Sequence, residues 1–223
     1  MKKIDMIEYS NNIDVNTKIK IANECLLVAN NAKFPTDFKD VYDHLFENDD
    51  YIKLFIRENE NIKGFIIGCL ENGYAGYVIL HIHGIIIDPS LQGKNISKIA
   101  LNSLVQQYRP DVVTAKTHNP RCFNAIANLT TEKCQFYPDG ESEIPEIIYN
   151  IVKSDQFIDC VDEKLVYRNA YPDEKIMQEY HNGCITKIFE NVEKYDAQAI
   201  VVVINNKILE EVKCKKLEMR KLN

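Results

Sequence analysis

The chain has 223 residues, a net charge of −6 and a sequence pI of about 5.5, and 45% of its residues are hydrophobic. This composition is typical of a globular protein with a sizeable core, and it excludes disordered, collagen-like and coiled-coil classes. No apolar run approaches the roughly 20 residues that cross a bilayer, and the stretch from Met1 to Glu8 lacks the apolar segment of a signal peptide. We therefore expect a cytoplasmic protein with no membrane partner.

Lysines and arginines are scattered along the chain, and their densest stretch runs from Lys213 to Lys221 at the C-terminus. Nucleic-acid binding requires a basic footprint, so we expect no nucleic-acid partner. The seven cysteines are odd in number, and none forms a Cys-x-x-Cys pair. This argues against a disulfide framework or a zinc site and favours reduced thiols.

Hydrophobic periodicity divides the first 136 residues into strands and helices. Apolar residues recur at helical spacing from Asp14 to Ala32, Pro35 ends that pattern, and Asp37 is placed to cap a second helix. The polar segment 58–61 separates two short apolar runs and predicts a hairpin. In chain order we expect a strand over 1–10, helices over 14–32 and 37–46, strands over 51–57, 64–70 and 77–87, a helix over 96–108, a strand over 112–116 and a helix capped by Asn119 with Pro120 at its first turn.

Beyond Phe136 the pattern is weaker. It favours helices over 142–153 and 173–195 and a strand over 164–169, and it clearly predicts a buried strand from Ala199 to Ile204. No linker demands a second domain. We therefore predict one domain over residues 1–223, with an extension after about residue 137 that completes the sheet.

The segment that joins the strand over 77–87 to the helix over 96–108 is the most informative. A loop from strand end to helix start aims several backbone N–H groups at one point and, with the helix dipole, forms an anion site that usually holds phosphate. Gly93 lets the backbone approach a ligand, Asn95 tolerates positive φ, and Ser97 can bond a phosphate oxygen. An ordinary tight turn is the alternative interpretation.

The spacing Gln92-x-x-Asn95-x-Ser97 resembles the Gln/Arg-x-x-Gly-x-Gly/Ala signature of the GNAT superfamily of acyl-CoA-dependent N-acyltransferases. The apolar run Ile85-Ile86-Ile87 before Asp88-Pro89 is similar to that family's strand end, and the expected element order over residues 1–136 is similar to GNAT order. The sequence departs from the signature at Asn95, where the family has Gly. The resemblance implies an α/β (α+β) fold with a mixed, mostly antiparallel central sheet, a splay between strands four and five, and flanking helices.

The same resemblance implies an N-acetyltransferase that moves an acetyl group from acetyl-CoA to a primary amine, by direct attack in a ternary complex and without a metal. The pantetheine arm would lie along Ile85, Ile86 and Ile87 like an added strand, and a backbone N–H near Ile87 would polarise the thioester carbonyl. The resemblance places the pyrophosphate on the amides of Gln92, Gly93, Lys94, Asn95, Ile96 and Ser97.

Two asparagines compete for the family position that touches the cofactor arm, because Asn119 and Asn124 both fit an Asn-x-x-Ala-like alignment. The family's acid tyrosine would fall at Ile126 in one alignment and at Thr131 in the other. Neither residue is a phenol, so we expect no single essential tyrosine. The nearest phenols in the sequence are Tyr108 and Tyr137.

A base must remove a proton from the substrate amine. Family members often use a carboxylate on the fourth strand, six residues before its end, and here that position is His81. His81 and His83 alternate onto one face of the strand with Ile85 and Ile87. We expect His81, directly or through a water shared with His83, to act as base, with Glu71 next in line. Two structurally satisfied histidines, or a His-x-His metal pair, are the alternatives.

Two further classes compete with the enzyme. One is a catalytically inert GNAT-like module that binds acyl-CoA as a sensor or scaffold, and the other is an unrelated α/β nucleotide-binding domain. For the enzyme we expect a small-molecule or protein amine as partner, and a monomer or homodimer as the assembly.

Overall fold

The structure is a computed structural model that describes residues 4–8, 12–129, 134–158, 161–170, 183–190 and 192–212. It divides into two compact units, Met1–Leu70 with Ile82–Tyr108, and Glu71–His81 with Arg109–Asn223. Strand β4 (Val78–Ile87) runs through both, so its start belongs to the second unit and its end to the first. Across the described part of the chain, no helix is long and apolar enough to cross a membrane.

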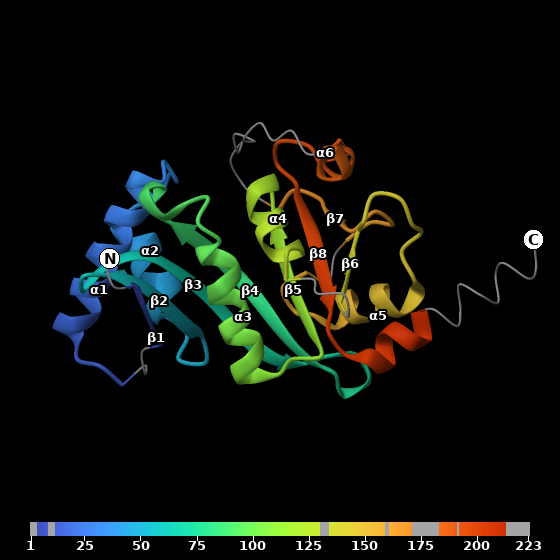
Figure 1. The fold of residues 1–223 in the computed structure, drawn as a ribbon, viewed down its shortest axis with the longest axis horizontal. Coiled ribbons are helices and arrows are strands. Elements are labelled where there is room, and N and C mark those ends of the chain that lie inside the picture. Colours follow the sequence, from blue (N-terminus) through green and yellow to red (C-terminus); the bar gives the residue numbers. More distant parts are fainter. Residues whose placement is uncertain are drawn as a thin grey trace, which may run out of the picture. The chain divides into compact units, whose positions relative to one another are not determined.

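The first unit combines two N-terminal helices with antiparallel strands (Figure 1). Its elements are β1 (Ile4–Glu8), α1 (Val15–Asn31), α2 (Phe38–Phe46), β2 (Ile52–Glu58), β3 (Asn61–Asn72), the end of β4 and α3 (Ile96–Tyr108). The predicted cap of the second helix is confirmed, because the Asp37 carboxylate accepts from the Asp40 N–H. The Asp14 carboxylate caps α1 in the same way, by accepting from the Thr17 N–H. The predicted hairpin is also confirmed, since β2 pairs antiparallel with β3.

One apolar core holds the first unit together. The buried face of α1, which includes Ile21, Ala22 and Cys25, packs with Leu45 of α2 and Phe55 of β2. These residues recur at helical spacing on α1, which is why the sequence pattern located the helix correctly. This core therefore holds in place the part of the first unit that carries the end of β4 and the loop after it.

The second unit is built around β8 (Ala197–Val203), whose seven residues are all buried. Its other elements are the start of β4, the short helix Tyr74–Gly76, β5 (Val112–Thr117), α4 (Pro120–Ala127), β6 (Gln135–Tyr137), α5 (Glu146–Ser154), β7 (Val166–Tyr167) and α6 (Gly183–Phe189). β8 pairs antiparallel with β5, β6 and β7, and Figure 1 shows it lying alongside β5. The predicted buried strand is therefore confirmed. It could be predicted because an unbroken apolar run suits a strand that is covered on both faces.

Strand order runs β1-β2-β3-β4 within the first unit and β4-β5-β8-β6 within the second. β4 and β5 are parallel, whereas the β1–β2, β2–β3, β5–β8 and β6–β8 pairs are antiparallel. The expected mixed, mostly antiparallel sheet with flanking helices is therefore confirmed. The single-domain organisation and the splay between β4 and β5 stay predictions.

Three expectations in the C-terminal half need correction. The helix expected over 142–153 begins only at Glu146, because Pro145 precedes it and the Asp139 side chain holds the N–H groups before it in a turn. The strand expected over 164–169 is limited to Val166–Tyr167. Of the helix expected over 173–195, the structure describes Gly183–Phe189 as helical; residues 171–182 lie outside the described part.

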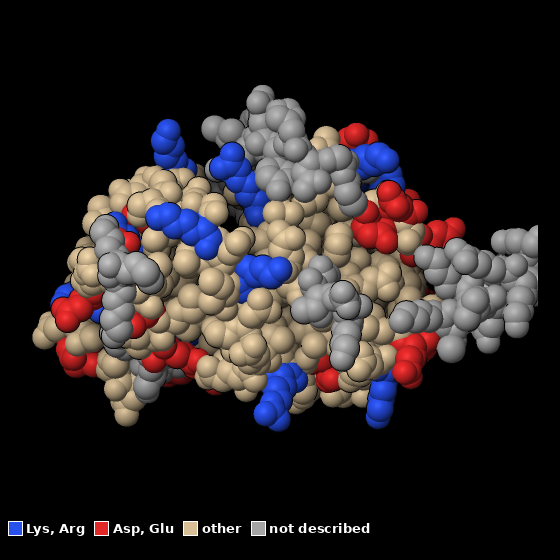
Figure 2. Space-filling model, in the orientation of Figure 1, with Lys and Arg blue, Asp and Glu red and all other residues tan. Residues whose placement is uncertain are grey.

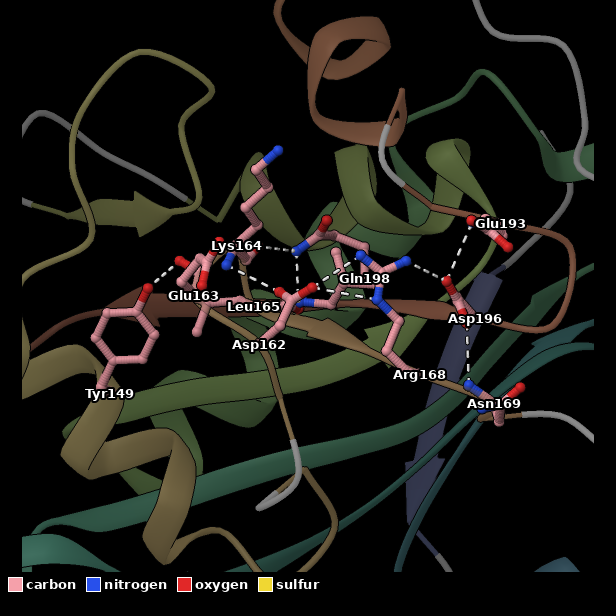
Figure 3. A network of polar contacts seen from close by, with 11 residues as sticks. Tyr149, Asp162, Glu163, Lys164, Leu165, Arg168, Asn169, Glu193, Asp196 and Gln198 are labelled. Carbon is pink, nitrogen blue, oxygen red and sulfur yellow. Dashed lines mark hydrogen bonds and ion pairs between the residues drawn. The ribbon is translucent and has the colours of Figure 1, made fainter.

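A network of polar side chains links β7 and the turn before it, residues 162–165, to β8 and the residue before it (Figure 3). This turn and β7 form a short hairpin with Val161. Arg168 donates to Asp162 Oδ2 at 2.8 Å and to Asp196 Oδ2 at 2.6 Å. The buried Gln198 side chain on β8 donates to the Leu165 carbonyl at 2.9 Å. Burial would raise the pKa of Asp196, but hydrogen bonds from the Asn169 N–H and from Arg168 hold that pKa below its ordinary value. The network satisfies the polar groups that the hairpin places against β8.

Candidate active site

The turn between β4 and α3 is shaped by two residues with left-handed backbone. Gly93 has φ 74° and Asn95 has φ 58°. Glycine adopts this region without cost, and asparagine is among the side chains that tolerate it best. Asn95 therefore takes the conformation that the sequence analysis expected of it, which explains how it can stand where the signature has Gly.

Backbone donors gather in this turn. The N–H groups of Gly93, Lys94, Asn95, Ile96 and Ser97 donate to no acceptor among the residues that the structure describes. Three of them belong to the turn and two to the first turn of α3, where the positive end of the helix dipole adds to their attraction for an anion. A Cβ at Gly93 would meet no atom within 4 Å.

Gln92 departs from its expected role as an amide donor. Its backbone N–H already donates to the Pro89 carbonyl at 3.3 Å, and its side-chain Nε2 donates to the Ile87 carbonyl at 2.8 Å. Gln92 thus ties the loop back onto the end of β4. The donors left for an anion begin at Gly93.

Asp88 anchors the start of the loop. Its carboxylate accepts from the Ser90 N–H at 3.0 Å, from Asn31 Nδ2 of α1 at 2.9 Å, and from Lys63 Nζ of β3 at 3.4 Å. Burial would raise the pKa of Asp88, but these hydrogen bonds and the Lys63 charge hold it well below its ordinary value. A short 3-10 helix, Pro89–Leu91, follows directly from this anchor.

The two ends of β4 differ in burial. Residues from His83 to Ile87 are only partly buried, whereas Ile79 to Ile82 are buried. A Cβ at Gly84 would meet no atom within 4 Å, whereas a Cβ at Gly64 on β3 would lie 2.8 Å from Ile87 Cδ1. No local sequence signal marks Gly84, whose open position becomes evident only in the structure.

His81 belongs to a buried polar cluster in the second unit. Its Nδ1 lies 3.0 Å from Asp155 Oδ2 and 3.0 Å from Thr114 Oγ1, and the ring of Phe157 stacks on the imidazole at 4.8 Å between centroids. His81 is 1% exposed, and Asp155 and Thr114 are fully buried. β4, β5 and the end of α5 each supply one polar member of this cluster.

The pKa values of two neighbouring carboxyl groups, Asp155 and Glu71, are shifted in opposite directions. Burial would raise the pKa of Asp155, but hydrogen bonds and charge from His81, with further bonds from Thr114 and the Phe157 N–H, hold it below its ordinary value. Burial, and then the neighbouring Asp155, raise the pKa of Glu71 to about 7. Two adjacent carboxyl groups rarely ionise together, so the partly buried Glu71 takes the proton.

A profile of the acetyltransferase (GNAT) family matches residues 19–127. This stretch, from α1 through α4, contains the anchored loop and the open strand end. This part of the chain belongs to the GNAT acetyltransferase family.

One solved structure agrees with this chain in fold, and a second aligns with it less well. The ribosomal-protein-S18-alanine N-acetyltransferase of Escherichia coli aligns with a TM-score of 0.51 at 13% identity, over 92% of this chain and 95% of that chain. An acetyltransferase of Thermus thermophilus aligns with a TM-score of 0.46 at 16% identity, over 62% and 91% of the two chains. At 13% identity the first likeness shows the fold alone. A search among functionally curated proteins gave no match.

GNAT enzymes use acetyl-CoA, and the loop residues fit its anionic part. The fit rests on five backbone donors that have no acceptor among the described residues, and on Gly93 of the loop and Gly84 of β4, where a Cβ would meet no atom within 4 Å. On the face drawn in Figure 2, lysine and arginine side chains stand dispersed over each unit. The groups that the loop itself offers to an anion are its backbone N–H groups.

The other predicted GNAT site residues have less direct support. His83 is partly buried, and its ring lies 4.5 Å from that of Tyr51 in the first unit. Asn119 caps α4, because its side chain accepts from the Arg121 N–H at 2.9 Å, so its carboxamide oxygen already has a helical partner. Asn124 is partly buried within α4. Their roles in the site stay predictions.

The two alignments with the family place its acid tyrosine at Ile126 or at Thr131, and neither position holds a phenol. Ile126 is fully buried in the apolar face of α4, and Thr131 lies outside the described residues. Tyr108 donates its hydroxyl to Glu8, and burial together with that carboxylate raises its pKa. Tyr137 sits in the core of the second unit, where burial raises its pKa to about 12.

Metal ligands are not gathered in the described residues, where no group of three or more His, Cys, Asp or Glu is arranged to hold an ion. Among the described residues, Cys25, Cys69, Cys122 and Cys134 are not joined in disulfides. Burial raises the pKa of Cys122 to about 11, which keeps it a thiol at neutral pH. This agrees with a structural role for Cys122.

Proposed function

We propose that the protein transfers an acetyl group from acetyl-CoA to a primary amine by direct attack within a ternary complex. The observation that carries the proposal is the anchored loop, whose five N–H donors follow an open strand end inside the family-matched segment. The alternation of left-handed Gly93 and Asn95 gives that loop the shape an anion-binding turn requires.

Each part of the loop and strand has a proposed role. The N–H groups from Gly93 to Ser97 hold the pyrophosphate, and Asp88 and Gln92 keep the loop in shape for it. The backbone of Ile85, Ile86 and Ile87 binds the pantetheine arm as an added strand. Acetyl-CoA supplies the activated thioester, and a backbone N–H near Ile87 stabilises the negative charge that develops on its carbonyl oxygen.

His81 is the proposed base. Once a neutral amine has attacked the thioester, its nitrogen carries an extra proton, and an imidazole can accept that proton near the working pH. The low exposure of His81 excludes bulk water from the ring, so a proton that it receives is not lost at once. Glu71, whose pKa is raised to about 7, is the second candidate.

An inert acyl-CoA sensor is the second candidate function. The observation in its favour is that His81 is 1% exposed and already has two partners on Nδ1. Such a module would bind acetyl-CoA through the same loop and would release no CoA when amines are added.

Gly84 provides the sharpest test of binding. A Val side chain there meets no protein atom within 4 Å of its Cβ but would project beside a ligand that lies along β4. Isothermal titration with acetyl-CoA should give a Kd at least ~10-fold weaker for Gly84→Val than for the wild type, with Gly84→Ala between them and the melting temperature unchanged.

Gly64→Ala on the neighbouring strand is the matched control. Its new Cβ crowds Ile87 Cδ1, so it should lower the melting temperature, which Gly84→Val should not. Equal acetyl-CoA affinity in wild type and Gly84→Val would contradict the proposed binding mode. Stabilisation by ATP but not by acetyl-CoA would favour a nucleotide-binding domain.

Turnover then separates the two candidate functions. Free thiol from acetyl-CoA is measured with a panel of polyamines, aminoglycosides, amino acids and peptides. CoA release that depends on one of these amines supports the transferase, and tight binding without release supports the sensor.

A further inference from the structure

The partners of His81 decide which ring nitrogen carries hydrogen. An ionised carboxylate can only accept, so the 3.0 Å contact between His81 Nδ1 and Asp155 Oδ2 requires a hydrogen on Nδ1. Thr114 is consistent with this, because its hydroxyl donates to the same Asp155 oxygen and leaves its lone pairs toward Nδ1. In the neutral ring, the lone pair then lies on Nε2.

Asp155 is itself firmly held. Its Oδ1 accepts from the Phe157 N–H at 2.9 Å, and its own N–H donates to the carbonyls of Ile151 and Val152 at the end of α5. Phe157 also stacks on the imidazole, so one short segment both carries the carboxylate and covers the ring. The orientation of His81 thus depends on a segment outside the family-matched residues 19–127.

Stability alone gives little reason for this cluster. Removing an imidazole and a carboxylate from water is costly, and apolar residues of similar size are often as stable in such places. Buried titratable pairs gather at functional sites for that reason. The arrangement repeats, with different residues, the way a carboxylate orients a catalytic imidazole in hydrolases.

We infer that Asp155 is a positioning residue that fixes His81 so that Nε2 performs both proton transfers of the acetyl transfer reaction. The inference rests on the proposed function for its catalytic part. It assigns a role to the C-terminal half, and it supplies a proton donor for a site in which neither alignment places a tyrosine.

The proton balance closes with one imidazole. The neutral amine nitrogen forms a bond to the thioester carbon, and the carbonyl pair moves to oxygen. Nε2 of His81 takes a proton from the positively charged nitrogen of that adduct, directly or through one water. The C–S bond breaks with its electron pair on sulfur, and the imidazolium returns the same proton from Nε2 to the thiolate. The products are the amide and CoA thiol, and His81 is again neutral with hydrogen on Nδ1.

Asp155→Asn tests the inference through the tautomer. An asparagine can turn an N–H toward Nδ1, which would move the ring hydrogen to Nε2 and remove the base. In ¹⁵N NMR spectra of labelled protein at pH 8, His81 of the wild type should carry hydrogen on Nδ1, and in Asp155→Asn on Nε2. The His81→Gln spectrum identifies the signals among the five histidines. With an amine that supports CoA release by the wild type, kcat of Asp155→Asn should be ~10²–10⁴-fold lower than that of the wild type, while its acetyl-CoA affinity is unchanged.

Asp196→Asn is the matched control. Asp196 is a buried carboxylate of the same unit that pairs with Arg168, so its loss should lower the melting temperature without changing the His81 tautomer or kcat. In the His81→Gln background, Asp155→Asn should cause no further loss of kcat, because a positioning residue acts only through His81.

The possible failures are distinguishable. A wild-type His81 with hydrogen on Nε2 overturns the inference even if Asp155→Asn does not fold. An active Asp155→Asn with unchanged kcat and tautomer overturns it as well. If the wild type releases no CoA with any amine, the proposed function and the catalytic part of the inference fail together, while the NMR result still decides whether Asp155 fixes the ring.

Discussion

The loop after β4 and the cluster around His81 are built from opposite materials. The loop offers backbone N–H groups from consecutive residues. It restricts side chains only at Gly93 and Asn95, where the residue must tolerate a positive φ. The cluster consists of side chains that the fold brings together across 33 and 74 residues. A backbone site should therefore tolerate changes that keep φ, whereas a buried side-chain cluster should tolerate almost none.

Ending the chain after Asn150 should have the largest effect. The truncation removes Asp155 and β8, whose seven buried residues pair with β5 and fill the core of the second unit. Each buried aliphatic side chain contributes about 1.5–3 kcal/mol, so the loss exceeds the stability of an ordinary domain. We expect no folded protein by circular dichroism. A soluble fragment that binds acetyl-CoA would show that the loop works independently of the cluster.

Asn95→Val should have the next largest effect. A β-branched residue resists positive φ, so the turn must deform and acetyl-CoA should bind ~10-fold or more weakly by titration calorimetry. Asn95→Gly keeps the conformation and restores the signature residue, so its affinity should match the wild type. If Val and Gly bind equally well, the shape of the turn is not what holds the cofactor.

Glu71→Gln should change the pH dependence of stability. Because the folded-state pKa is raised from 4.5 to about 7, the folded protein keeps a proton on Glu71 that the unfolded chain has released. Stability should therefore fall as pH rises through this window. The uncharged Gln should reduce the difference between pH 5 and pH 8 by about 1 kcal/mol, a modest value because Glu71 is partly open to solvent.

Chemical denaturation at a series of pH values measures this effect. The exposed Glu141→Gln serves as the control and should leave the profile unchanged. An identical slope for wild type and Glu71→Gln would mean that Glu71 does not share the proton of the Asp155 cluster.

Tyr108→Phe in the first unit and Tyr137→Phe in the second should have the smallest effects. Tyr108 bonds Glu8 and Tyr137 fills the core of the second unit, and the pKa of each is raised. Turnover at saturating acetyl-CoA should fall far less than ~100-fold in either variant. A larger loss with intact folding and cofactor affinity would identify that tyrosine as the acid and displace His81 from that role.

The same contrast explains what the sequence can reveal. The helix caps at Asp37 and Asn119, and the turn at Asn95, depend on neighbours within a few residues, so local patterns predict them. β8 is also predictable, because a short, unbroken run of apolar residues is expected to form a strand in the interior of a sheet.

The pairing of His81 with Asp155 was not predictable. Asp155 follows an apolar helix as an ordinary C-terminal polar residue, and nothing local marks it as buried. Only the packing of α5 against the sheet decides that its carboxylate meets an imidazole 74 positions earlier. β6 was likewise too short, at three residues, to give a periodic signal.

Asp88 has a consequence for acid tolerance. With its pKa held well below the ordinary 3.8, the carboxylate stays charged in mildly acidic solution, and its stabilising contribution is lost only as pH falls toward that lowered value. The frame that it forms with Asn31, Lys63 and Ser90 should keep its shape from pH 7 down to about 5. A phosphate monoester on a ligand, by contrast, takes up one proton near pH ~6, where its dianion becomes a monoanion. A change in cofactor affinity in that range would then report the chemistry of the ligand, with the loop as a constant background.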